Sequence, residues 1–150
     1  MSYQEKERVA SSLSGIVITL IYTWIIYRSK IVPRPGIVED FSFWGKIVLI
    51  FIGVSIGART ILLIIFNIIY MISTRGEDGP PAFKDERDKL IELKSVRNSL
   101  VVFTIGFVTA MVLLAAGLPG YSMFPVLMAG GLLSEIAGDI SAVRYYRRGM

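Results

Sequence analysis

Long apolar runs dominate the chain, and four of them are long enough to cross a membrane. A spanning helix needs about 20 mostly apolar residues, because the hydrocarbon core of a bilayer is about 30 Å thick. The runs cover residues 10–27, 46–72, 99–118 and 121–143. The pattern predicts an all-α, polytopic integral membrane protein with four transmembrane helices in a single domain, residues 1–150.

Composition supports a membrane protein and removes several kinds of chemistry. Hydrophobic residues make up 53% of the chain and charged residues 19%, whereas soluble domains have about 45–50% and about 25%. The chain has no Cys and no His, so disulfides, a thiolate nucleophile and an imidazole base are excluded. Phosphate-binding, zinc-protease and serine-hydrolase motifs are also absent from the sequence. We therefore expect no enzyme, no cofactor and no metal site.

Basic residues are unevenly divided between the two ends of the predicted spans. The two tails and the loop between the second and third spans hold eleven Lys and Arg, and the other two loops hold four. The positive-inside rule then predicts a cell-membrane protein with both termini in the cytoplasm. The first span reads as a retained signal anchor, because no small-residue cleavage site follows it. The cytoplasmic basic residues alternate with acidic ones, so no direct nucleic-acid partner is expected.

Aromatic residues mark the outer loop. Phe41, Phe43 and Trp44 follow a stretch that Pro33, Pro35 and Gly36 keep from being one regular helix. Aromatic rings collect where a membrane meets water. We therefore expect residues 41–44 in the headgroup region of the bilayer.

A charged helix is predicted at residues 81–98, running directly into the third span. Pro81 suits a first helical position, and acidic residues come before basic ones, as the helix dipole favours. With the span, it would form a rod of about 36 residues that extends into the cytoplasm. Its charges are either a solvated surface or a docking site for a cytoplasmic partner or a second copy, formed by Asp85, Glu86, Arg87, Asp88, Lys94 and Arg97.

Three ionisable residues lie inside predicted spans: Arg59, Glu135 and Asp139. A charge at the bilayer centre costs about 2.5–3.5 kcal/mol on insertion scales, so each is expected to find a partner. Arg59 and Glu135 have similar depth and opposite charge, which predicts an ion pair. Asp139 could share Arg59 or reach Arg144, and two acids for one arginine would leave a surplus carboxylate. The cluster either holds helices in register or forms an ion path or a binding site.

Small residues indicate where helices come close. In the fourth span a ridge of small residues recurs every four positions, and the second span carries Gly53 and Gly57. Such ridges let backbones approach, so we expect the second and fourth helices to touch, within one subunit or across a dimer. The ridge consists of Gly130, Ser134, Gly138 and Ala142.

The run KDERDKLIELKSVRNS, residues 84–99, leads directly into an apolar span. In this it resembles the DUF2178-like group of small prokaryotic membrane proteins of unknown function, over about the second half of the chain. The resemblance implies a prokaryotic origin, a membrane architecture and, for some members, a helix-turn-helix regulator as partner. It implies no mechanism.

Two classes of function follow from these patterns. The first is a regulatory or interaction protein whose charged helix contacts a cytoplasmic regulatory protein or a second copy, in a homo-oligomer. The alternative is a small oligomeric transporter or channel for ions, protons or a charged solute, lined by Arg59, Glu135 and Asp139. In both classes the lipid bilayer surrounds the protein, and four short spans make a narrow bundle, so any pathway is expected between subunits.

Overall fold

The computed structural model describes residues 3–73 and 86–148, and every regular element in them is a helix. Four long helices are present: α1 (Tyr3–Ile26), α2 (Phe41–Ser73), α3 (Glu86–Ala115) and α4 (Met123–Arg147). Three short ones lie in the connections: η1 (Tyr27–Ile31), η2 (Pro35–Glu39) and η3 (Gly120–Ser122). The prediction of four helices long and apolar enough to cross a membrane is confirmed.

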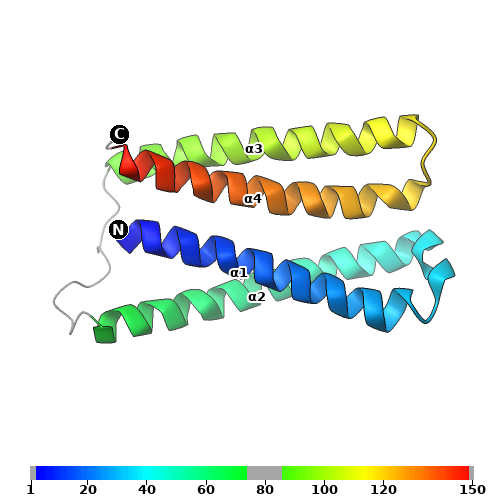
Figure 1. Cartoon of the computed structure of the whole chain (residues 1–150), viewed down its shortest axis with the longest axis horizontal. Helices are drawn as coiled ribbons and strands as arrows, with labels where there is room; N and C mark the ends of the chain where they lie inside the picture. The colour runs from blue at the N-terminus through cyan, green and yellow to red at the C-terminus, as the bar shows by residue number, and fades with distance from the viewer. Residues whose placement is uncertain (1–2, 74–85, 149–150) are drawn as a thin grey trace.

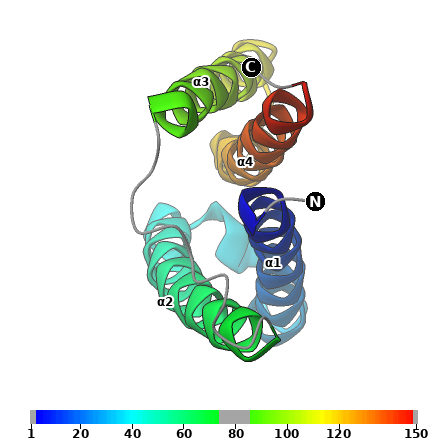
Figure 2. The ribbon, with the colours of Figure 1, turned by 90° about the vertical axis from the view of Figure 1, so that its left-hand side faces the viewer.

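The helices stand side by side in the order α2, α1, α4, α3 instead of closing into a bundle. α1 begins and α4 ends at one end of the molecule (Figure 1), which we call the terminal end. The α1–α2 and α3–α4 connections lie at the other, the loop end. α3 and α4 form a hairpin, α1 packs on α4, and α2 packs on α1. Viewed end-on, the helices follow an open arc with α2 and α3 at its tips (Figure 2).

α3 joins the predicted charged segment and the predicted third span in one unbroken helix. Its 30 residues make a rod of about 45 Å at 1.5 Å per residue. Residues 81–85, including Asp85 of the predicted docking set, lie outside the described residues. The helix stops at Ala115 because Gly117 adopts a φ of +88°. The amides of Gly117 and Leu118 then donate back to the carbonyls of Leu114 and Leu113, at 3.0 and 3.2 Å, which is the Schellman way of ending a helix.

The aromatic residues of the outer loop form a small core at the loop end. Phe43 and Trp44 are 9% and 7% exposed and pack with Tyr22 and Ile47. The Trp44 indole N–H donates to the Val38 carbonyl at 2.8 Å, because η2 folds the loop back over the ring. These two rings are therefore covered by protein, and the expected place of residues 41–44 in the headgroup region stays a prediction. Phe41 remains exposed.

The ridge of small residues on α4 packs against α3. A Cβ atom on Gly106 of α3 would lie 3.0 Å from the Cα of Gly130, and one on Gly138 would lie 3.2 Å from the Cβ of Ser99. Gly53 and Gly57 of α2 have open space where a Cβ would stand. Within one chain the prediction that this ridge brings α4 against α2 is wrong, because the ridge faces α3, and α1 packs on both α2 and α4. The alternative, a contact across a dimer, stays a prediction.

Candidate functional site

Arg59 of α2 and Glu135 of α4 form an ion pair between a guanidinium nitrogen and Oε1. This is the pair expected from their depth and opposite charge. The two side chains are 33% and 25% exposed, so both are largely enclosed by protein. Since α1 packs between these helices, the Arg59 side chain crosses over α1 to reach its partner.

Gly15 is the residue of α1 at which Arg59 crosses. It is buried, and a Cβ atom on it would lie 2.7 Å from Arg59 Nη2 and 2.8 Å from Glu135 Oε1. Any side chain here would displace the ion pair. Gly15 was not predicted as a site residue; the one signal for it in the sequence is that it is the single glycine of α1.

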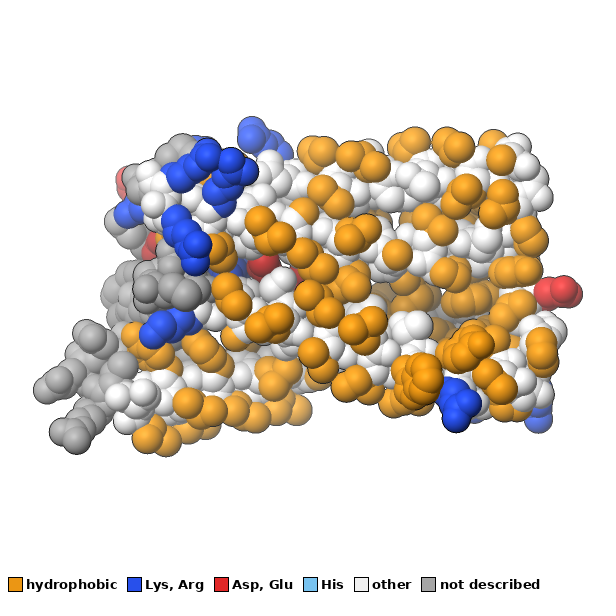
Figure 3. All heavy atoms as spheres, in the orientation of Figure 1, with side chains coloured by type: hydrophobic (Ala, Val, Ile, Leu, Met, Phe, Trp, Pro, Cys, Tyr) orange, Lys and Arg blue, Asp and Glu red, His pale blue; other side chains and the backbone are white. Residues whose placement is uncertain are grey.

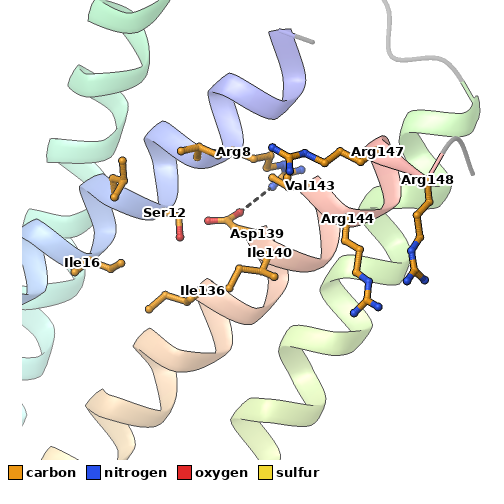
Figure 4. Close-up of a pocket in the computed structure, with 12 residues that line it drawn as sticks. Arg8, Ser12, Ile16, Ile136, Asp139, Ile140, Val143, Arg144, Arg147 and Arg148 are labelled. Carbon is orange, nitrogen blue, oxygen red and sulfur yellow. Dashed lines mark ion pairs between the residues drawn. The ribbon is translucent and has the colours of Figure 1, made fainter. Parts of the chain in front are cut away.

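Asp139 is paired with Arg8 of α1 across the α1–α4 seam (Figure 4). Arg8 Nη1 lies 3.7 Å from Asp139 Oδ1, and the same guanidinium lies 3.9 Å from Glu92 of α3. Neither expected partner, Arg59 or Arg144, forms an ion pair with Asp139 in the described part of the chain. Arg144 is five positions further along α4 and so points away from the face that Asp139 shares with Glu135.

Arg8 also removes the surplus negative charge that the sequence suggested. From the sequence, Arg8 is one of the eleven basic residues that predict orientation, whereas in the structure it faces Asp139, which is 7% exposed. Two guanidinium groups therefore stand opposite Glu135 and Asp139. With Arg8 included, the cluster of Arg59, Glu135 and Asp139 has no net charge.

Together these side chains form a line along α4. Glu135 and Asp139 are one helical turn apart, about 6 Å along the axis, and Arg8 with Glu92 continues the line toward the terminal end. In residues 3–73 and 86–148, Arg59 Nε and Asp139 Oδ2 are buried and have no hydrogen-bond partner. Buried polar groups are nearly always satisfied, so this line has room for a further polar group or a water.

A pocket of about 740 Å³ connects the middle of this line with the loop end. All four helices contribute to it, from Gly45 and Phe124 at one end to Arg59 and Glu135 at the other. Its walls are mostly apolar, and Ser55 adds a buried hydroxyl with no partner among the described residues. The Arg59–Glu135 pair is therefore open to a small polar solute on this side.

The charges of the predicted docking helix do not form one solvent-facing set. Arg87 donates to the Tyr146 carbonyl at 3.5 Å, Lys94 lies over the Tyr145 ring, and Glu92 faces Arg8. Arg97 is exposed, as are Glu86 and Lys89, whereas Asp88 is half-buried. Apolar side chains also face outward on this segment: Leu90, Leu93 and Val96 are 58%, 68% and 59% exposed.

In the described ranges, no group of three or more Asp and Glu residues is placed to hold a metal ion. Comparisons of the chain with protein-family models, curated proteins and solved structures find no match. The resemblance to the DUF2178-like group therefore stays a prediction.

Proposed function

We propose that this chain is a small transporter or channel of the cell membrane that moves protons or another small ion past Arg59, Glu135 and Asp139. One observation carries the proposal. The pocket from the loop end meets the Arg59–Glu135 pair, and one turn further on the line Asp139–Arg8–Glu92 leads to the terminal end. Rows of ionisable side chains inside membrane helices are typical of proton relays and ion pathways.

Each charged residue has a role in such a pathway. Glu135 takes up a proton from the pocket when its contact with Arg59 loosens, and the proton passes to Asp139 over about 6 Å, through a water. Arg59 and Arg8 return the carboxylates to their ionised form after each transfer, because an adjacent positive charge favours the anion. Glu92, at the terminal end, exchanges protons with solvent.

A homo-oligomer would complete the pathway. α2 packs on α1 at one tip of the arc, and α3 forms the other tip (Figure 2). The 740 Å³ pocket has lining residues on both tip helices. A second copy packed against them would separate the pocket from lipid, and chemical cross-linking in membranes tests this.

For orientation, we propose that both termini face the cytoplasm, following the positive-inside rule. The chain has no Cys, so single cysteines can report on each side. Gly36→Cys in the α1–α2 connection should react with a membrane-impermeant maleimide added to intact cells, and Arg148→Cys should react only after the membrane is opened. The reverse pattern would overturn the orientation but not the pathway.

Proton flux into proteoliposomes tests the function directly. With a pH-sensitive dye inside and a potassium diffusion potential as driving force, the wild type should acidify the lumen faster than empty vesicles. Glu135→Gln and Asp139→Asn should each reduce the flux at least tenfold. Glu39→Gln is the matched control, because this carboxylate is exposed in η2 and lines neither part of the pathway. A wild type no faster than empty vesicles, for protons and for Na⁺ and K⁺, would overturn the proposal.

The second candidate is the interaction protein, favoured by the exposed stripe of Leu90, Leu93 and Val96 at the terminal end of α3. We propose a cytoplasmic regulatory protein or a second copy as its partner. A purified partner should lose binding to Leu93→Glu and to Glu86→Lys with Arg87→Glu, and should keep binding to Ile105→Ala, a change on the same helix away from the stripe. Unchanged binding by both Leu93→Glu and the charge-reversed variant would exclude this surface.

A further inference from the structure

A second groove runs along the α1–α4 seam at the terminal end, on a different face of α4 from the 740 Å³ pocket. It has a volume of about 580 Å³. Its walls are apolar, and four arginines line its terminal end: Arg147 extends toward Arg8, whereas Arg144 and Arg148 extend side by side away from Arg8 and Asp139 (Figure 4). The apolar wall residues are Val9, Leu13, Ile16, Ile136, Ile140 and Val143.

The mouth of this groove carries an excess of positive charge. Arg144, Arg147 and Arg148 are exposed and form no ion pair with any described residue. Asp139 is the one acidic residue in the lining, and Arg8 neutralises it. Three unneutralised guanidinium groups within one turn of helix attract an anion and can hold its oxygen atoms through paired N–H donors.

The groove extends about two helical turns along the seam. From Val143 to Ile136 the helix α4 rises about 10 Å, which is about a third of the 30 Å hydrocarbon core. Basic side chains gather at the terminal end of this face, and the surface beyond them is mostly apolar (Figure 3).

We infer that this groove binds an anionic membrane lipid, with the phosphate on Arg144, Arg147 and Arg148 and one acyl chain along the seam. A soluble anion would leave the apolar walls unfilled, whereas a lipid matches both the charged mouth and the apolar length. Basic pockets between helices at the cytoplasmic surface are known to select anionic headgroups. The site does not use Arg59 or Glu135, whereas Arg8 and Asp139 belong both to its lining and to the proposed pathway. The test below measures lipid binding and no ion flux, so the two proposals fail separately.

Spin-labelled lipids test this inference. In phosphatidylcholine membranes, the wild type should immobilise spin-labelled phosphatidylglycerol several-fold more than spin-labelled phosphatidylcholine. The variant with Arg144→Gln, Arg147→Gln and Arg148→Gln should bring this ratio close to one. The matched control changes three basic residues at the loop end, Arg28→Gln, Lys30→Gln and Arg34→Gln, and should keep the wild-type ratio.

A variant that fills the groove distinguishes lipid binding in the groove from general electrostatic attraction of anionic lipids to a basic surface. Ile140→Trp keeps all four arginines but places an indole where the acyl chain would lie, since Ile140 is a wall residue 61% exposed. It should lower the ratio as strongly as the triple variant. An unchanged ratio in folded Ile140→Trp would overturn the groove as the site. Displacement of the labelled lipid by inorganic phosphate or glycerol 3-phosphate would show a soluble-anion site instead.

Discussion

Gly15 of α1 lies directly against the guanidinium of Arg59 from α2: a Cβ atom on Gly15 would come within 2.7 Å of Arg59 Nη2. The ion pair that joins α2 to α4 therefore depends on the absence of a side chain from the helix between them. Glycine at position 15 therefore determines whether Arg59 can reach Glu135.

Gly15→Ala should separate Arg59 from Glu135 or push α1 outward, and should lower the free energy of unfolding by about 1–3 kcal/mol, as overpacking does. Thermal unfolding in detergent measures this. Gly45→Ala is the matched control, because a Cβ there meets open space, and Ala favours a helix over Gly by about 1 kcal/mol. Equal melting temperatures for the two variants would contradict the crossing at Gly15.

Gly130→Ala should destabilise the α3–α4 hairpin. Its Cβ would lie 3.3 Å from the Cα of Gly106, and two backbones cannot yield as a flexible side chain can. The expected loss is about 1–3 kcal/mol, read from the same unfolding experiment. Gly131→Ala changes the next residue of the same helix, where no atom lies within 4 Å, and should be neutral or stabilising. A reversed order of the two variants would refute the close contact.

Arg8→Gln should destabilise the protein by removing the partner of a nearly buried carboxylate. Removing one member of a buried pair costs about 3–5 kcal/mol in soluble proteins, and polar contacts within membranes are weaker, about 0.6–1.7 kcal/mol. We expect a loss of about 1–3 kcal/mol between these limits. Asp139→Asn added to Arg8→Gln should recover most of it, because the nearly buried charge is then gone and Glu92, the other partner of Arg8, is 43% exposed. Additive losses in this double-mutant cycle would show that the two residues do not interact.

Trp44→Phe should cost about 1 kcal/mol, since it removes the 2.8 Å indole bond to the Val38 carbonyl. It also reduces the aromatic area stacked on Phe124, where the centroids are 5.5 Å apart and the planes 2° from parallel. Trp24→Phe serves as the control, because that ring is 63% exposed. If both variants melt alike, the loop-end core contributes nothing to stability.

The position of a charged residue along its helix could be predicted from the sequence. The neighbouring helix toward which its side chain points could not. Counting residues from the span ends placed Arg59 and Glu135 at similar depth, and the structure joins them. Predicting the partner of Asp139 requires knowing which helix packs against the face of α4 that carries Asp139. Arg8 had a second explanation as a flanking charge, so its contact with Asp139 went unnoticed.

The same limit applies to packing. A ridge of small residues predicts that another helix packs closely, but it does not predict which helix. Here α3, the other helix of the hairpin, packs on the ridge, where α2 was expected. The ridge residues are Gly130, Ser134, Gly138 and Ala142. Trp44 shows a related difficulty. An aromatic residue at a span end suits the headgroup region, and only the fold of η2 over the ring buries it.

The crossing of Arg59 over α1 also sets an order of events when the chain is made. Arg59 lies on α2, whereas Glu135 lies on α4, which is synthesised later. Ribosomes add about 5–20 residues per second, so several seconds pass before the carboxylate arrives. During this interval the nascent chain carries an unmatched guanidinium. For the proposed membrane protein this means that the insertion machinery shelters the guanidinium, or α2 stays shallow, until the α3–α4 hairpin packs beside α1.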